Sequence, residues 1–327
     1  MSSERGSVAT QLSSRTAVVA LGGNAITLEG QPGTYDEMLA NCQSMVKSIV
    51  EICEAGWRVV ITHGNGPQVG NLAVQQDEAE HLVPGQPLCA LGAMTQGLIG
   101  HLIETALLNE GGRSFGSIVS VVTHVDVDPG DPAFINPTKP IGPFYSLTQA
   151  QERSARTGQP IIEDAGRGYR VVVASPRPRR VLEREAIQAL VNQGFMVIAG
   201  GGGGVPVIDD HGTIRGIDAV IDKDRAAALL ASELQADALV LVTGVDAVLL
   251  DFGKPTQREL TVVAAEEMHE HARAGQFPAG SMGPKVEAAL DFIDAGGGVA
   301  VITSANLMFS ALDSLSGPGT HIVRSTG

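Results

Sequence analysis

The stretch VVALGGNAITL, residues 18–28, decides how the rest of the chain is interpreted. Its first four residues form an apolar run, which predicts a strand buried in a core. That strand ends at Gly22, Gly23 and Asn24, and no large side chain follows until Ile26. A bare backbone at this point suits either a tight turn from strand to helix or the close approach of a ligand. For a single glycine pair the turn is the simpler interpretation, so the choice depends on the other strands.

Similar apolar, β-branched runs recur along the chain and predict more strands of the same kind. They are continuous rather than alternating, as in strands that are covered on both faces. Segments with apolar residues at three- and four-residue steps lie between them and predict helices. This alternation predicts a three-layer αβα sandwich with a central, mostly parallel sheet. The expected strands are 17–21, 58–62, 117–122, 195–199, 238–243 and 299–303, and the expected helices are 36–55, 94–110, 182–193, 224–235, 263–274 and 284–295.

The composition excludes several classes of protein. The 327 residues carry a formal net charge of −14, which argues against non-specific binding to nucleic acid or to an anionic membrane. No apolar stretch reaches the roughly 18 residues of a membrane span, and the polar start has no apolar signal segment. The three cysteines form no CxxC pair, as in a reducing compartment. We therefore expect a cytoplasmic protein with a flexible extension over residues 1–15.

Residues 126–180 interrupt the alternation of strands and helices. They are rich in proline and polar residues, and a structureless loop of this length is uncommon inside a compact domain. The segment is better interpreted as a small inserted subdomain that could act as a lid.

Small residues follow four of the predicted strands, so the first glycine pair is not alone. His63-Gly64-Asn65-Gly66 follows the second strand, five glycines occupy 200–204, and Thr243-Gly244 ends a later strand. Ligands bind at the carboxyl ends of strands in open parallel sheets, where exposed N–H groups can hold an anion. Four such loops favour a polyanionic ligand such as a nucleotide. The dinucleotide G-x-G-x-x-G and the G-x-x-x-x-G-K-[ST] motif are both absent, which excludes the commonest nucleotide sites.

Three lysines lie in unusual surroundings for a chain with few positive charges. Lys139 follows Thr138 and precedes Pro140, Lys223 lies between two aspartates, and Lys285 lies where a helix begins. Most lysines are solvated surface charges, but rigid neighbours make that interpretation weaker here. Phosphoryl transfer depends on positioning and on cations that stabilise the moving charge. The lysines and the glycine loops together favour such chemistry.

Taken in order, the motifs make the chain resemble the carbamate kinases of the amino-acid-kinase superfamily, over about residues 16–324. They are ALGGNAI (20–26), HGNGPQVGNL (63–72), NPTKPIGPF (136–144), EDAGRGYR (163–170), GGGGGVPV (200–207), VIDKD (220–224), VTGVDAV (242–248), FGKP (252–255) and GSMGPK (280–285). The resemblance implies reversible transfer between ATP with carbamate and ADP with carbamoyl phosphate, with Mg²⁺ bound to the nucleotide phosphates. It also implies a homodimer that forms ATP in arginine catabolism.

The resemblance further implies a role for each matching residue. Residues 16–215 would bind carbamoyl phosphate and residues 216–327 the nucleotide. The implied catalytic residues are Lys139, Lys223, Asp224 and Lys285, with Asp224 orienting the lysines. The implied substrate-binding residues are Gly22, Gly23, Asn24, Gly64, Asn65 and Gly66. The implied nucleotide-binding residues are Thr243, Gly244, Val245, Asp246, Ala247, Phe252, Gly253, Pro255, Met282 and Lys285, and no protein side chain is assigned to the metal.

Two positions distinguish members of the superfamily. Many relatives carry a lysine where this chain has Ala20, and the carbamate kinases resemble this chain in lacking it. Lys139 would then take its place. The family often has an aromatic residue where Ala247 stands, which leaves adenine packing there open.

Other interpretations remain for several residues. The chain could be another small-anion kinase of the same fold, or a nucleotide or metabolite sensor that has kept the loops but not the activity. His63 could act as a base, although carbamate is already an anionic nucleophile and a positioning or structural role is preferred. His269 and His271 lie on different faces of a helix at their spacing, so a metal pair there is disfavoured.

Overall fold

The computed structural model describes residues 15–28, 30–111, 116–164, 166–278 and 280–325. The expected extension over residues 1–15 lies outside them, apart from Arg15, and so does the side chain of Asn24. The helices in this part of the chain are α1 (Gly23–Ile26), α2 (Tyr35–Glu54), α3 (Gly66–Ala79), α4 (Leu88–Gly111), α5 (Leu147–Thr157), α6 (Arg184–Asn192), α7 (Lys223–Glu233), α8 (Ala265–Arg273), α9 (Met282–Asp294) and α10 (Met308–Asp313).

The expected mostly parallel sheet is confirmed. Its order in the described residues is β15-β17-β16-β12-β1-β2-β9-β3, and each neighbouring pair is parallel except β16 with β17. The six strands expected from the sequence all lie in it. The members are β1 (Thr16–Leu21), β2 (Arg58–His63), β3 (Ile118–Ser120), β9 (Met196–Ile198), β12 (Ala238–Thr243), β15 (Val262–Ala264), β16 (Val299–Ser304) and β17 (Thr320–Val323).

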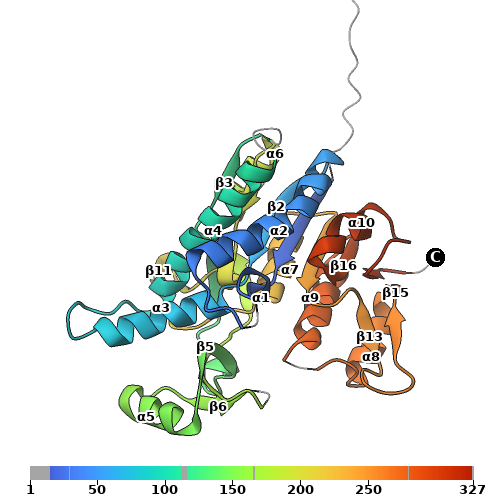
Figure 1. Cartoon of the computed structure of the whole chain (residues 1–327). Helices are drawn as coiled ribbons and strands as arrows, with labels where there is room; N and C mark the ends of the chain where they lie inside the picture. The colour runs from blue at the N-terminus through green and yellow to red at the C-terminus, as the bar shows by residue number, and fades with distance from the viewer. Residues whose placement is uncertain (1–14, 29, 112–115, 165, 279, 326–327) are drawn as a thin grey trace, which may run out of the picture.

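Helices cover both faces of this sheet, which makes the three layers that the continuous apolar runs predict (Figure 1). Val18 and Ala20 of β1 belong to a core with residues of α7 and α9, whereas Ala17, Val19 and Leu21 belong to a core with α2 and α4. Successive side chains of a strand point to opposite faces, so a strand between two cores must be apolar at every position.

Residues 126–180 divide between two small sheets. β4 (His124–Val127) and β8 (Pro178–Val181) pair with each other, and β4 also pairs with β10 (Val205–Asp210), which pairs with β11 (Thr213–Gly216). The part that protrudes in Figure 1 is the sheet of β5 (Lys139–Tyr145), β7 (Tyr169–Val173) and β6 (Ile161–Glu163) with α5. The inserted unit is therefore shorter than 126–180, because strand pairing at both ends of the segment joins it to the body of the protein. A separate hairpin consists of β13 (Val248–Leu250) and β14 (Arg258–Leu260).

The protruding unit is attached closely to α3. A Cβ atom added to Gly70 of α3 would lie 2.0 Å from the Cα atom of Gly142 in β5, so the helix and the strand touch backbone to backbone. Arg153 of α5 also forms an ion pair with Asp77 of α3. These contacts hold Lys139, the first residue of β5, at the edge of the main sheet.

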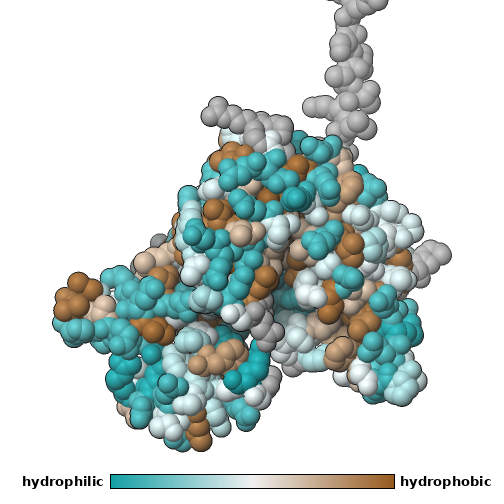
Figure 2. Space-filling model, in the orientation of Figure 1, coloured by the Kyte–Doolittle hydropathy of each residue, from teal (hydrophilic) through white to brown (hydrophobic). Residues whose placement is uncertain are grey.

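The face of the molecule seen in Figure 2 is mixed in hydropathy. Figure 2 shows mostly hydrophilic and intermediate residues, with small hydrophobic patches, one of them on the loop that follows α3. Leu82 and Val83 of that loop are exposed. No helix in the described residues is long and apolar enough to cross a membrane. The three cysteines are free, and Cys42 is buried.

Candidate active site

The first glycine loops meet at the carboxyl ends of β1 and β2. A Cβ atom on Gly64 would lie 2.7 Å from the nitrogen of Gly23 and 3.1 Å from Cδ of Lys223. A Cβ atom on Gly66, in contrast, would have no atom within 4 Å. Gly64 is therefore required for one loop to pack against the other, whereas Gly66 leaves open space above the backbone. The two interpretations of a strand end without side chains therefore both apply here: close packing at Gly64 and open access at Gly66.

The glycine run at 200–204 has a different role from the one its composition suggests. All five residues are buried, and Cβ atoms on Gly201, Gly202 and Gly203 would lie within 2.4 Å of His63, Asn65 and Ile221. In this run, only Gly202 lines the cavity described below. The run mainly lets three loops approach one another, because a side chain at these positions would displace its neighbours.

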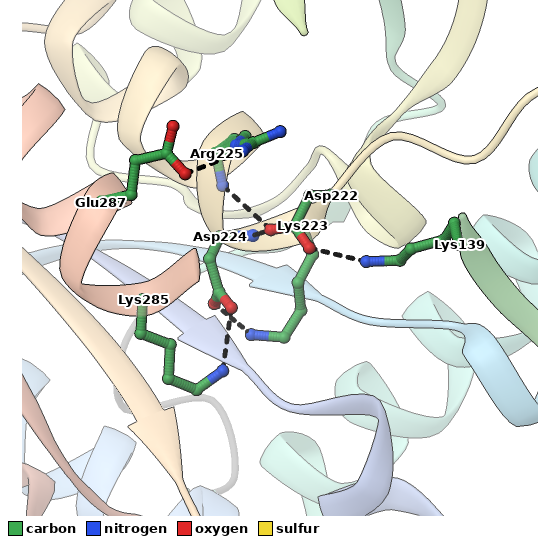
Figure 3. Close-up of polar contacts among 7 residues, drawn as sticks. All are labelled: Lys139, Asp222, Lys223, Asp224, Arg225, Lys285 and Glu287. Carbon is green, nitrogen blue, oxygen red and sulfur yellow. Dashed lines mark hydrogen bonds and ion pairs between the residues drawn. The ribbon is translucent and has the colours of Figure 1, made fainter. Parts of the chain in front are cut away.

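Two lysines share one aspartate at the start of α7. Nζ of Lys223 lies 2.5 Å from Oδ1 of Asp224, and Nζ of Lys285, in the first turn of α9, lies 2.8 Å from Oδ2 of Asp224 (Figure 3). Asp224 is 3% exposed. Two ammonium groups are thus held side by side by a single buried carboxylate.

The third lysine is paired with the neighbouring aspartate. Nζ of Lys139 lies 2.6 Å from Oδ2 of Asp222, while Oδ1 of Asp222 accepts hydrogen bonds from the backbone N–H groups of Asp224 and Arg225. Asp222 is thereby the N-cap of α7. This side chain links the protruding unit to the helix that carries Lys223.

Burial and neighbouring charges oppose each other in this cluster. Burial would raise the pKa of Asp224, but the charges of Lys223 and Lys285 outweigh it and hold the pKa below its ordinary value. For Asp222, burial is likewise outweighed by Lys139, and the pKa lies well below its usual range. The pKa of Lys223 is lowered by burial, with Asp224 opposing the shift and Lys285 adding to it. Both carboxyl groups are therefore ionised at neutral pH and can hold the lysines.

His63 lies directly behind the second glycine loop. Burial lowers its pKa to about 4, so the ring is neutral at neutral pH. Its Nδ1 atom lies 3.1 Å from the carbonyl oxygen of Gly64, which makes Nδ1 the protonated nitrogen that donates this hydrogen bond. The contact orients the Gly64 peptide.

A cavity of about 600 Å³ joins these groups. Of the residues expected from the sequence, the ones lining it are Gly22, Gly23, Gly64, Asn65, Gly66, Lys139, Lys223, Asp224, Thr243, Gly244, Val245, Ala247, Phe252, Met282 and Lys285. Asp246, Gly253 and Pro255 are expected residues that do not line it; all three are exposed. They belong to loops whose neighbouring residues face the cavity, and a motif does not show which residue of a loop points inward.

The cavity also has walls that the sequence reasoning did not assign. Asp222 could have been found, because an aspartate within two residues of the start of a predicted helix is a candidate N-cap. Leu249 of β13 and Phe277, which follows α8, have no such local signal. Both are apolar and line the same cavity as Ala247. No group of three or more histidine, cysteine or acidic side chains within the described ranges could hold a metal ion.

Comparison with known proteins agrees with the fold and with the motifs. Residues 15–304 match the model of the amino acid kinase family. The chain is 48% identical to the carbamate kinase of Pyrococcus horikoshii, over 92% of this chain and 97% of that protein. Among solved structures, carbamate kinase from Giardia lamblia bound to citric acid is 40% identical, covering 95% of this chain and 99% of that one, with a TM-score of 0.90. The same Giardia enzyme bound to AMP-PNP has a TM-score of 0.87 at the same identity and coverage.

These matches extend over nearly the whole chain, at identities that show more than a shared fold. They confirm the resemblance that the ordered motifs predict. The chain therefore belongs to the amino acid kinase family and, within it, to the carbamate kinases.

Proposed function

We propose that this protein catalyses the reversible reaction of ATP and carbamate to ADP and carbamoyl phosphate. The observation that supports this most directly is the pair of ammonium groups of Lys223 and Lys285 on Asp224, beside the glycine loops and in the same cavity. A transferring phosphoryl group develops charge that cations placed in advance can stabilise. Two buried cations beside a stretch of open backbone suit that requirement.

The phosphoryl-binding side of the proposed site is built from backbone. Gly22, Gly23 and the loop Gly64–Gly66 would surround the anionic groups, together with Asn24 at the start of α1. The N–H group of Gly64 donates to the carbonyl oxygen of Leu21, so the N–H donors to the anion would come from its neighbours. Helix N-termini carry partial positive charge, and α1 and α3 both begin at these loops. Lys223 and Lys285 would stabilise the transferred group, and Asp224 would keep them oriented.

The nucleotide would occupy the other side of the cavity, along the wall from Thr243 to Ala247 and near Phe252 and Met282. That wall is mainly apolar, as the contact surface of an adenine ring should be. The Giardia relative is bound to AMP-PNP, which supports nucleotide binding by this chain. Lys139 would approach from the protruding unit of β5, β6, β7 and α5, and we propose that this part of the segment 126–180 acts as the lid.

Magnesium fits this site as an ion carried by the nucleotide. Asp222 and Asp224 line the cavity, but lysines occupy both carboxylates. Mg²⁺ commonly keeps several waters and binds substrate phosphates with only one or two protein carboxylates. When bound, it would neutralise charge on the β- and γ-phosphates, while the protein supplies the lysines and backbone donors.

The assay that tests this proposal is formation of ATP from ADP and carbamoyl phosphate. We expect ATP formation that depends on both substrates and is abolished by EDTA. In the opposite direction, ATP consumption should require carbamate and not N-acetylglutamate or aspartate, which separates this activity from related kinases. ADP binding by calorimetry with no turnover in either direction would instead identify a sensor.

The cellular setting is part of the same proposal. We expect a homodimer in the cytoplasm that works in the ATP-forming direction during arginine breakdown. Light scattering of the purified protein tests the dimer. Growth of a deletion strain with arginine as the energy source tests the direction.

A further inference from the structure

Glu287 lies in α9, close to the catalytic lysines but outside the cavity. Its Oε2 atom accepts a hydrogen bond from Nη2 of Arg225 at 2.7 Å, and its Oε1 atom contacts the guanidinium group of Arg177. Figure 3 shows the Arg225–Glu287 contact beside the cluster formed by Lys223, Asp224 and Lys285. Both oxygens of this carboxylate are therefore used to join separate elements.

The Arg225–Glu287 contact is a second ion pair between α7 and α9. Arg225 directly follows Asp224 in α7, and Glu287 lies two residues after Lys285 in α9. The Asp224–Lys285 ion pair therefore has a second ion pair beside it, formed by the same two helices. The two helices also pack through a shared apolar core, and a second ion pair on this packing restricts their relative orientation further than the first one alone.

The second contact connects α9 to the base of the protruding unit. Arg177 lies between β7 and β8, and its backbone N–H donates to Oδ2 of Asp131 at 2.9 Å. Asp131 precedes β5, so the segments that enter and leave the unit are joined at this point. The Arg177 side chain is 61% exposed, so its ion pair with Glu287 is weak compared with that of Arg225, which is 26% exposed.

Stability alone is a poor explanation for the inner ion pair. Nε of Arg225 is buried and has no hydrogen-bond partner among the described residues. An unsatisfied buried donor destabilises a protein, and apolar residues often stabilise such a position as well as an ion pair does. Compared with apolar packing, an ion pair fixes the relative orientation of the two helices more closely, because a guanidinium and a carboxylate interact best in one geometry.

We propose that Glu287 is a positioning residue for phosphoryl transfer. Through Arg225, and more weakly through Arg177, it sets the orientation of α9 on α7 at which Lys285 and Lys223 share Asp224. This inference rests on the proposed kinase function. The inference goes beyond the proposed function because it assigns a role to residues that contact neither the cavity nor the substrates.

The experiment compares Glu287→Gln, Arg225→Met and the double variant with the wild type in the ATP-forming assay. We expect kcat to fall about tenfold in each single variant, less than the 10²-fold that a misplacement of 1 Å can cost. The KM for ADP should change less than about twofold, because the nucleotide wall is untouched, and the double variant should lose no more than either single one. Asp209→Asn is the matched control, since Asp209 forms an ion pair of the same 2.7 Å with Arg180 outside the cavity.

A crystal structure of Glu287→Gln separates this proposal from the proposed function. We expect the contact of Lys285 Nζ with Asp224 Oδ2, 2.8 Å here, to lengthen or break. An active wild type with unchanged kcat in Glu287→Gln, or an equal loss in Asp209→Asn, would overturn the positioning role. If the wild type itself forms no ATP, the proposed function fails, and the crystal structure then decides: an unchanged Lys285–Asp224 contact would overturn the positioning role as well.

Discussion

Replacing Asp224 with Asn is the sharpest perturbation of the site. The side chain keeps its size but loses the charge that holds two ammonium groups, at 2.5 Å from Lys223 and 2.8 Å from Lys285. The amide retains one oxygen that can accept a hydrogen bond, and it places an NH₂ group where the other lysine donates. One of the two lysines therefore loses its partner and is repelled by the other.

The expected cost follows from burial. Removing one partner of a buried ion pair costs about 3–5 kcal/mol, and the remaining amide oxygen places Asp224→Asn near the lower value, about 3 kcal/mol. At about 2 °C per kcal/mol for a chain of this size, Tm should fall by about 6 °C. Turnover should fall by about 10²-fold, the scale for one misplaced donor to the transition state.

The pH profile distinguishes a loss of charge from a loss of packing. Burial lowers the pKa of Lys223, and Asp224 is the first group that opposes this shift. A lysine that must be protonated supports activity below its pKa, and activity is lost as the pH rises through it. In Asp224→Asn this alkaline limb of kcat should move to lower pH, because the opposing charge is gone.

The measurement is a coupled assay of ATP formation from about pH 6 to about pH 10, a range below the ordinary lysine pKa of about 10.4. Thermal unfolding of the same samples, at each pH, shows that the protein is folded during the assay. An alkaline limb that stays where it is in the wild type, together with kcat within about twofold of wild type, would refute the reasoning.

Three further changes test other parts of the site. Lys285→Ala should lower kcat by about 10²-fold or more and lower Tm less than Asp224→Asn does, because Asp224 keeps Lys223 as its partner; wild-type kcat would contradict the assignment of Lys285 to the transferring group. Lys139→Ala should slow turnover while calorimetry finds the ADP affinity within about twofold of wild type, and a large loss of ADP affinity would instead assign this lysine to the nucleotide. Gly70→Ala places a methyl group 2.0 Å from the Cα atom of Gly142, so hydrogen exchange over 139–173 should accelerate. Gly92→Ala is the control, because Gly92 has open space around it and its substitution should not change exchange. Equal exchange in both glycine variants would show that α3 does not anchor the protruding unit.

Local patterns in the sequence were sufficient for the layers of the fold. A strand buried between two helical layers must be apolar at every position, and a helix on one face must repeat every three to four residues. Both patterns lie within a few consecutive residues, which is why the six expected strands and the six expected helices are present, although α3, α5, α10 and the strands β15 and β17 were not predicted. The same local character applies to the glycines that end the strands and to the ordered motifs that show the family.

Contacts between segments far apart in the chain were decided only by the tertiary structure. That Lys285 shares Asp224 with Lys223 depends on how α9 packs on α7, and no pattern within either helix specifies that packing. The ends of 126–180 could not be predicted as strands of another sheet, since strand pairing depends on a partner elsewhere in the chain.

The glycines at 200–204 show the difference most clearly. Their number predicts an open loop at the end of a strand, and the sequence alone correctly places them there. Only the folded chain surrounds them with His63, Asn65 and Ile221 and turns most of an apparent ligand cradle into a packing contact. The physical reason is that a missing side chain makes space available, and the neighbours that the fold brings close decide whether protein or ligand fills it.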